Sequence, residues 1–422
     1  MGIALAGVIV PLAAVPAFAA DKVELVVVAN NWAQSVLTAM QNAADKFTAA
    51  HPNVTVTVTP RGAGWDSVLV AVAAGSPQDV VLTGNGGAGD QMWAPFQDLS
   101  ALMQRDHFRS GVFEPTWDNF TWQGKVYAVP GVETGPRNGF VWNKEFLDAA
   151  GISVDPDHPM NWDTFWNDAD KLTVLDADGR VSRMGFDPLN GQNSRVWNVA
   201  PMFGATWYDP ATGAPTLDNE KLVDGIQMFD DHVFKKYTGF KGSTGWYDFA
   251  LKHNVAVTNL GDYAPGEIGS RDPKLQFVVS WPPQNEGKRV QVDVGWGMAI
   301  PKGAKHPDLS WELIKFLATD VDFQLALYHG SGFIGAGKAF LAALAGELVT
   351  KKDAPLLWYV NSMNQADVLD ALSGAPVNNY GVAAFTTAFK DVYAGRKSAK
   401  EALTEANQQT IAKMQDDGWL PK

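Results

Sequence analysis

Residues 23–84 alternate between apolar runs of strand length and amphipathic segments of helix length, and this alternation restricts the fold more than any other feature of the chain. The runs 23–29 (VELVVVA), 54–59 (VTVTVT) and 79–84 (DVVLTG) are rich in β-branched residues. Apolar residues recur at helical spacing between the first two runs, and residues 65–75, between the second and third, end in glycine. Strands and helices that alternate through short connections predict an α/β fold with an open, mostly parallel sheet.

Polar and aromatic side chains follow these strands at the ends where an open parallel sheet binds its ligands. Asn31 and Trp32 come after the first strand, Trp65 and Asp66 stand at the start of the second helix, and Asn85 follows the third strand. Amides and carboxylates hydrogen-bond hydroxyl groups, and indole faces stack on the apolar faces of sugar rings. A single Asn after a strand is explained by the preference of Asn for turns. Three strand ends of the same character indicate a site for a hydroxylated ligand.

The segment 256–265 (AVTNLGDYAP) repeats this pattern in the second half of the chain. It begins as a buried strand and ends in Asn259, Asp262 and Tyr263. These side chains offer an amide, a carboxylate and an aromatic face to a ligand. A capped strand with an ordinary buried tyrosine remains the alternative interpretation.

Composition argues against several classes of function. The net charge of −13 disfavours nucleic acid and anionic membrane surfaces as partners. The chain has no cysteine, which excludes disulfides, thiolate metal sites and a cysteine nucleophile. Residues 84–89 (GNGGAG) lack the Lys and Ser/Thr of a phosphate loop, and residues 176–180 (DADGR) lack the spaced carboxylates of a calcium loop. We therefore expect no cofactor, no metal and no nucleic-acid partner.

Residues 1–20 are apolar and contain Ala17-Phe18-Ala19, the small-x-small pattern of a signal-peptide cleavage site. The segment is too short and too interrupted by proline to span a membrane. We expect the protein to be exported to the periplasm through a cleavable signal peptide. No cysteine follows the apolar run, so we expect no lipid anchor, and we expect a monomer.

Several segments resemble the periplasmic solute-binding proteins of ABC importers, the large family that includes maltose-binding protein. The most specific is residues 122–152 (WQGKVYAVPGVETGPRNGFVWNKEFLDAAGI), where the family's chain crosses between two lobes. Segments in the same order that support it are 25–58, 76–87, 248–268, 294–319 and 393–410. The resemblance covers nearly the whole chain after residue 20.

The resemblance implies the two-lobed periplasmic-binding-protein fold, with mixed, mostly parallel sheets, helices on both faces and a ligand cleft between the lobes. It implies that residues 21–131 and 295–332 form the first lobe, and that residues 132–294 and 333–422 form the second. The chain would cross between the lobes three times, and these crossings would act as a hinge.

The resemblance also implies the residues that contact the ligand in the second lobe and at the crossings. Tyr263 takes the place of the family's stacking aromatic residue, with Asp262 beside it. The other implied contacts are Glu133, Arg137, Asn138, Trp197, Trp207, Trp296 and Tyr380. The implied function is capture of a mono- or oligosaccharide between closing lobes and its delivery to the permease subunits of an ABC transporter.

Two alternatives remain. A secreted glycoside hydrolase or lyase would need two carboxylates at one bond; nothing marks Asp66, Glu133 or Asp262 as such a pair, the HExxH and GxSxG motifs are absent, and we expect no catalytic residue. A receptor for a sugar phosphate or acidic sugar would use arginine, and the candidates are Arg61, Arg137 and Arg195.

Overall fold

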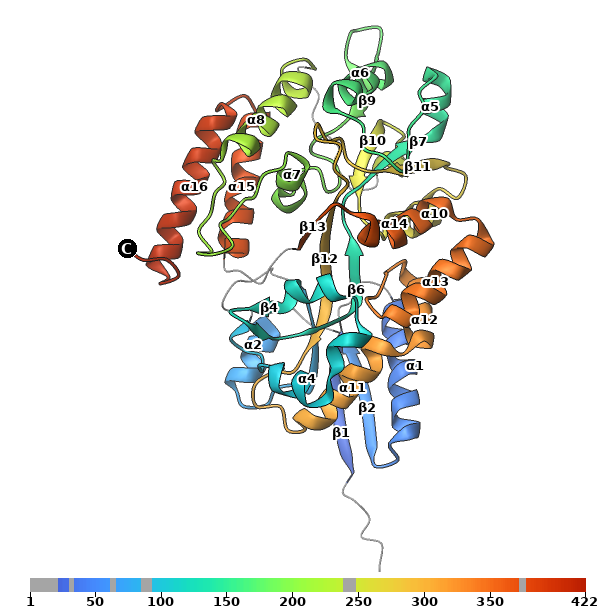
Figure 1. The fold of residues 1–422 in the computed structure, drawn as a ribbon, viewed down its shortest axis with the longest axis vertical. Helices are drawn as coiled ribbons and strands as arrows, with labels where there is room; N and C mark the ends of the chain where they lie inside the picture. Colours follow the sequence, from blue (N-terminus) through green and yellow to red (C-terminus); the bar gives the residue numbers. More distant parts are fainter. Residues whose placement is uncertain (1–21, 30–33, 61–65, 85–92, 238–247, 372–376) are drawn as a thin grey trace, which may run out of the picture.

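The computed structural model describes residues 22–29, 34–60, 66–84, 93–237, 248–371 and 377–422. These residues form two α/β lobes, each built on its own sheet (Figure 1). The predicted α/β fold with two mixed sheets is confirmed. The predicted division of the chain at residues 131, 294 and 332 stays a prediction.

The first sheet has the strand order β13-β12-β3-β1-β2, and β6 also pairs with β12. β1 is parallel to β2 and β3, as the alternating pattern of the sequence predicts. β12 is parallel to β13 and antiparallel to β3 and β6. The strands are β1 (Val23–Ala29), β2 (Val54–Pro60), β3 (Val80–Gly84), β6 (Val129–Pro136), β12 (Val290–Ala299) and β13 (Val368–Ala371).

The second sheet has the order β11-β7-β10-β9-β8, and in its described part only β9 and β10 run parallel. A short hairpin of β4 (Thr121–Trp122) and β5 (Lys125–Val126) stands apart. The strands of the second sheet are β7 (Gly139–Asn143), β8 (Val174–Leu175), β9 (Val181–Phe186), β10 (Val255–Leu260) and β11 (Phe277–Ser280). Parallel pairing therefore predominates in the first sheet but not in the second.

Helices pack around the first sheet, and α1 buries a continuous apolar face. In α1 the residues Val36, Met40, Ala43, Ala44 and Phe47 are buried, as their helical spacing predicts, while Leu37 is half-buried. The helices of this lobe are α1 (Gln34–Ala50), α2 (Asp66–Ala73), α4 (Ser100–Asp106), η1 (Phe108–Gly111), η2 (Glu114–Phe120), α11 (Pro307–Thr319) and α12 (Val321–Ser331).

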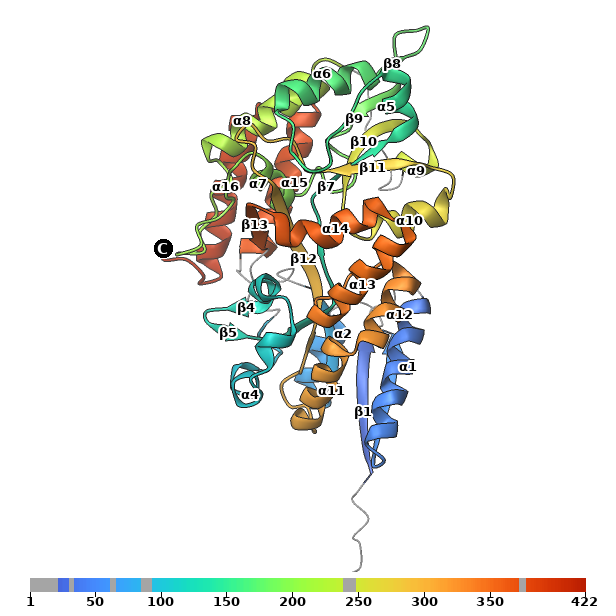
Figure 2. The same cartoon turned by 45° about the vertical axis from the view of Figure 1, so that its right-hand side comes forward.

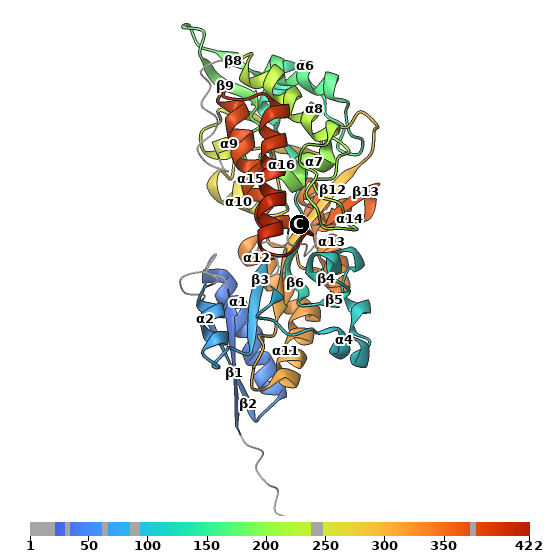
Figure 3. The same cartoon turned by 90° about the vertical axis from the view of Figure 1, so that its left-hand side faces the viewer.

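The second lobe has an aromatic-rich core in which Trp142, Trp162, Trp166 and Phe229 pack against neighbouring helices. The C-terminal helices α15 and α16 lie side by side on this lobe (Figures 1 and 3). The helices are α5 (Lys144–Ala150), α6 (Trp162–Leu172), α7 (Val196–Met202), α8 (Glu220–Phe229), η3 (Asp230–Phe234), α9 (Asp248–Leu251), α10 (Ala264–Arg271), α13 (Lys338–Lys351), α14 (Ala354–Gln365), α15 (Val377–Tyr393) and α16 (Ala399–Asp416).

Two long antiparallel strands, β6 and β12, run from one lobe to the other (Figures 1 and 2). In their register Asp293 faces Pro136 near the second lobe, and Met298 faces Val129 within the first. The register shifts between Trp296 and Gly297. The third connection follows α12, which ends at Gly332 with a φ of +79°. We call the region where these three segments meet the waist.

Candidate ligand-binding site

The candidate site is built at the carboxyl ends of the parallel neighbours β9 and β10. Every residue of β10 is buried, so both faces of this strand are fixed by packing. The backbone N–H of Gln192, in the loop after β9, donates to the carbonyl of Asn259 at 2.8 Å. Gly191 permits this approach, because its φ is +58° and a Cβ would overlap that carbonyl. The loop after β9 therefore meets the carboxyl end of β10.

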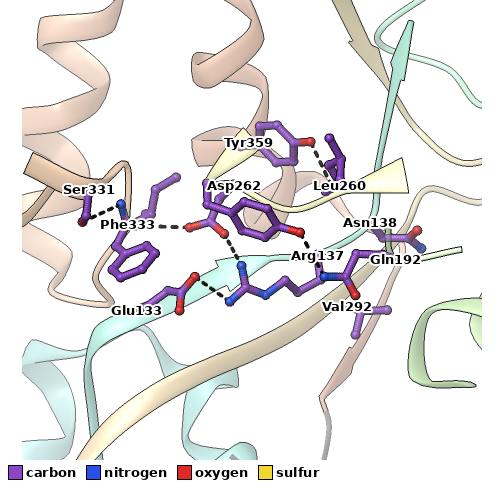
Figure 4. Close-up of polar contacts among 12 residues, drawn as sticks. Glu133, Arg137, Asn138, Gln192, Leu260, Asp262, Val292, Ser331, Phe333 and Tyr359 are labelled. Carbon is purple, nitrogen blue, oxygen red and sulfur yellow. Dashed lines mark hydrogen bonds and ion pairs between the residues drawn. The ribbon is translucent and has the colours of Figure 1, made fainter. Parts of the chain in front are cut away.

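A buried cluster of charges lies at the waist beside these loops (Figure 4). Arg137, directly after β6, donates from Nη2 to Glu133 Oε1 at 2.6 Å and from Nη1 to Asp262 Oδ1 at 2.8 Å. The three residues are at most 6 % exposed. Burial opposes the charged form of Arg137, but Glu133 and Asp262 outweigh it and raise its pKa. Both terminal nitrogens of Arg137 are thus engaged by carboxylates of the protein.

Asp262 bonds to two of the three segments of the waist. Its backbone N–H donates to the carbonyl of Pro136 at 2.9 Å, and its Oδ2 accepts from the backbone N–H of Ile334 at 3.2 Å. Gly135 lies so close that a Cβ there would overlap the carboxylate. Burial raises the pKa of Asp262 to about 7, against the lowering effect of Arg137. The position after β10 is therefore tied to β6 and to the segment that follows α12.

Tyr263 is held from two sides. Its hydroxyl accepts a hydrogen bond from Gln192 Nε2 at 3.1 Å, and the Arg137 guanidinium lies 5.0 Å from the centre of its ring. The residue is 7 % exposed, and burial raises the pKa of its phenol to about 12. The ring is therefore a neutral, fixed aromatic group that borders the waist.

Buried amides surround Tyr263 and Arg137. Asn259 Nδ2 donates to Asn138 Oδ1 at 2.6 Å, and Asn198 Nδ2 donates to the carbonyl of Arg137 at 2.8 Å. Each amide also carries an atom that has no hydrogen-bond partner among the described residues: Asn138 Nδ2, Gln192 Oε1, Asn198 Oδ1 and Asn259 Oδ1. We call these four residues the amide cluster. The amide cluster is held in place by hydrogen bonds and still has donors and acceptors without a partner. Such unpaired atoms are rare among buried polar groups.

A cavity of about 400 Å³ opens between helices α1 and α12 of the first lobe and α10 of the second. Its lining includes Glu267, Tyr328 and Phe333. Gly332 also lines it, and a Cβ on this glycine would lie 3.6 Å from the carbonyl oxygen of Tyr263. The cavity therefore adjoins the Tyr263 segment, and its volume lies within the range of small-molecule sites.

The structure places the remaining predicted residues in different surroundings. Trp197, at the start of α7, is half-buried with the Arg195 guanidinium 5.6 Å from its ring centre, whereas Trp207 is 2 % exposed inside the second-lobe core. Trp296 of β12 is half-buried against Gly84. The hydroxyl of Tyr380 donates to Asp417 at 2.8 Å. Only Trp207 is thus part of a closed core, and the ligand contacts of all four stay predictions.

The predicted residues of the first lobe lie outside the described residues. This applies to Asn31, Trp32, Arg61, Trp65 and Asn85, and to the side chain of Asp66 at the start of α2.

Sequence reasoning missed Gln192, and it placed Asp293 only at a crossing between the lobes without assigning it a contact. Gln192 lies in residues 190–193 (NGQN), which follow β9 as Asp262 and Tyr263 follow β10. The expectation that polar residues gather at strand ends would have identified Gln192 if residues 181–186 had been recognised as a strand. Asp293 carries no such signal, because it lies inside β12, and pairing with β6 places its carboxylate beside the ion pairs of the waist.

The described part of the chain contains no group of three or more His, Asp or Glu that could hold a metal ion. None of its helices is both long and apolar enough to cross a membrane.

Residues 29–322 match the profile of the family described as bacterial extracellular solute-binding protein, and the chain belongs to this family. This confirms the predicted class of protein, a solute-binding protein rather than an enzyme.

Three relatives illustrate the similarity. The chain is 22 % identical over 361 residues to a lactose-binding protein of Rhizobium radiobacter, with 81 % of each chain covered. It is 28 % identical over 245 residues to a probable amino-acid ABC transporter periplasmic-binding protein of Sinorhizobium fredii, covering 56 % of this chain and 51 % of the relative. A solved structure, CpMnBP1 with mannotriose bound, superimposes with a TM-score of 0.75 at 24 % identity, covering 92 % of this chain and all of the other. The structural match confirms the two-lobed fold.

Replacing Arg137 should destabilise the protein strongly. Arg137→Leu leaves Glu133 and Asp262 buried without their cation, which should lower the free energy of unfolding by about 3–5 kcal/mol. Arg180→Leu is the matched control, because Arg180 pairs with Asp178 on the surface and such pairs contribute little. Urea unfolding of the two variants measures the difference. Equal unfolding midpoints would show that the buried pairs do not stabilise the waist.

Proposed function

We propose that this protein is the periplasmic sugar-binding component of an ABC importer. A neutral mono- or oligosaccharide binds between the lobes, and the closed protein delivers it to the permease subunits. The relatives named for lactose and solved with mannotriose support a sugar ligand. The apolar residues 1–20 with their small-x-small ending support export through a cleavable signal peptide.

The observation that carries the proposal is the amide cluster around Tyr263. Neutral amides are both donors and acceptors, as sugar hydroxyls are, and an aromatic ring beside them offers a face to the ring of a sugar. Asn138, Gln192, Asn198 and Asn259 keep an unused donor or acceptor, as expected of groups that a ligand or bound water would complete. In this proposal Asn31, Trp32, Trp65 and Asn85 complete the site from the first lobe.

The charge arrangement favours a neutral ligand over an anionic one. A sugar phosphate or an amino-acid carboxylate needs a cation whose charge is not already balanced by carboxylates of the protein. Both terminal nitrogens of Arg137 already bond to Glu133 and Asp262. Arg137 therefore supports the geometry of the site and does not contribute charge to the ligand.

The waist supports closure by hinge motion. Its three segments are β6, β12 and the connection after α12, and two packed lobes joined in this way close around ligands by hinge bending. We propose the lobe boundaries given by the sequence, with residues 21–131 and 295–332 moving against the remainder.

Sugars should stabilise the protein, and other solutes should not. A ligand at about 100 times its dissociation constant raises the free energy of unfolding by about 2.7 kcal/mol. Thermal-shift measurements should therefore show a clear increase with lactose, mannotriose or a related oligosaccharide. Sugar phosphates and amino acids are the comparison set. A shift with amino acids alone would reject the sugar and favour the class named for the Sinorhizobium relative.

Tyr263 should contribute a large part of the affinity. Tyr263→Ala removes the aromatic face and should weaken sugar binding at least about tenfold, or about 1.4 kcal/mol. Tyr263→Phe is the matched control, because it keeps the ring and loses only the hydrogen bond from Gln192. Isothermal titration measures both affinities. A folded Tyr263→Ala variant with unchanged affinity would remove Tyr263 from the site.

Closure should accompany binding. A ligand shifts the equilibrium between open and closed forms by its differential affinity for them. Small-angle scattering should therefore show a smaller radius of gyration with saturating sugar, and tryptophan fluorescence should change at the same sugar concentration. The same radius in the presence of bound sugar would indicate a rigid site.

A further inference from the structure

Asp293 is a buried carboxylate that the ion pairs of the waist leave without a cation. It lies on β12 opposite Pro136, next to the cluster of Glu133, Arg137 and Asp262. All four charged residues are at most 6 % exposed. One guanidinium is therefore enclosed with three carboxylates, and Arg137 bonds to only two of them.

The surroundings of Asp293 favour its neutral form. Its Oδ2 accepts a hydrogen bond from Asn119 Nδ2 at 3.0 Å, while its Oδ1 is buried and has no hydrogen-bond partner among the described residues. An ionised carboxylate with an unbonded buried oxygen is costly, whereas a proton removes its charge. Burial raises the pKa of Asp293 to about 8, and the attraction of Arg137 only partly opposes this.

Most of the other charged and titratable groups around Asp293 are carboxylates or phenols. Asp262 and Asp118 raise its pKa further by their charge, and Arg137 lowers it. The elements packed against β12 carry Glu133 and Arg137 on β6 and just after it, Asp262 and Tyr263 after β10, Asp118 on η2, Tyr359 on α14, Asp370 on β13 and Arg195 before α7.

A charge on Asp293 acts on Tyr263 through Arg137. The Arg137 guanidinium lies against the face of Tyr263 and bonds to Asp262, the residue before it. The carbonyl of Pro136, opposite Asp293, accepts the backbone hydrogen bond of Asp262. An ionised Asp293 competes with Glu133 and Asp262 for the one cation that supports the Tyr263 ring.

We propose that Asp293 is a positioning residue that must be neutral for the binding arrangement of Tyr263. When Asp293 is protonated, Arg137 holds Glu133, Asp262 and the Tyr263 ring together. Loss of the proton draws Arg137 toward β12 and releases the ring. This inference rests on the proposed function, since it concerns affinity for the same ligand.

The expected pH dependence has a definite sign. A neutral sugar does not titrate, so the contribution of Asp293 to its affinity should stay constant in mildly acidic solution and be lost as the pH rises through about 8. At about pH 9 only about a tenth of the molecules keep the Asp293 proton, so the Asp293 contribution should make affinity about tenfold weaker than at about pH 6.5.

The contribution of Asp293 to the free energy of unfolding should also decrease as the pH rises. The folded protein holds this proton more tightly than the unfolded chain, so the contribution of Asp293 to stability is greatest at low pH and declines as the pH rises from about 4 to about 8.

The experiment compares the wild-type protein with Asp293→Asn. The amide is neutral at every pH and keeps an oxygen for Asn119. Asp262, whose pKa is about 7, titrates over the same range in both proteins. Titrations with lactose and mannotriose at about pH 6.5 and about pH 9 should therefore show a loss of affinity in the wild type that is about tenfold larger than any loss in Asp293→Asn. Asp118→Asn, the same change at a neighbouring carboxylate, should keep the loss. Urea unfolding across the same range should show a flatter pH profile for Asp293→Asn.

Each result of this experiment supports or overturns the proposed role of Asp293. A wild-type affinity that does not change with pH, or an equal loss in Asp293→Asn, overturns the positioning role and leaves the sugar-binding function standing. If neither sugar binds at any pH, the proposed function fails for these ligands, and the positioning role fails with it. The unfolding profiles then show independently whether Asp293 holds the buried proton.

Discussion

The buried guanidinium of Arg137 is the interaction on which the arrangement of the waist depends. A buried charge is costly unless it is paired, and here the pairing reaches Glu133 on β6 and Asp262 after β10. Asp262 extends the connection to Ile334 beyond α12. Electrostatic pairing therefore holds together segments that are far apart in sequence and that join the two lobes.

This pairing also explains the small residues of the waist. Gly135 and Gly261 lie against the cluster, and a Cβ on Gly261 would be 2.7 Å from Tyr263 and 2.8 Å from Arg137. Side chains at these positions would separate the charges. Glycine at these positions therefore lets the charged side chains and Tyr263 approach the backbone closely. It also provides the conformational freedom that a hinge requires.

The same cluster determines which chemistry is left for a ligand. Because Arg137 is occupied by carboxylates, the groups with unused bonding capacity at this end of the second sheet are neutral amides. Neutral donors and acceptors beside an aromatic ring suit hydroxyl groups and not ionic groups. The charged residues support the site, and the uncharged residues beside them are suited to contact the ligand.

The sequence by itself determined the α/β class, the parallel β1, β2 and β3, and the buried face of α1, because all of these follow from local hydrophobic periodicity. Through its resemblance it also indicated the family and placed Glu133, Arg137, Asp262 and Tyr263 in one region. Only the tertiary structure decided that Arg137 bonds to both carboxylates, that Trp207 lies in a closed core, that Gln192 bonds to Tyr263, and that the carboxylate of Asp293 is buried beside these ion pairs. Most of these contacts join residues distant in the chain. They are fixed by pairing between strands and by burial, which leave no local pattern in the sequence.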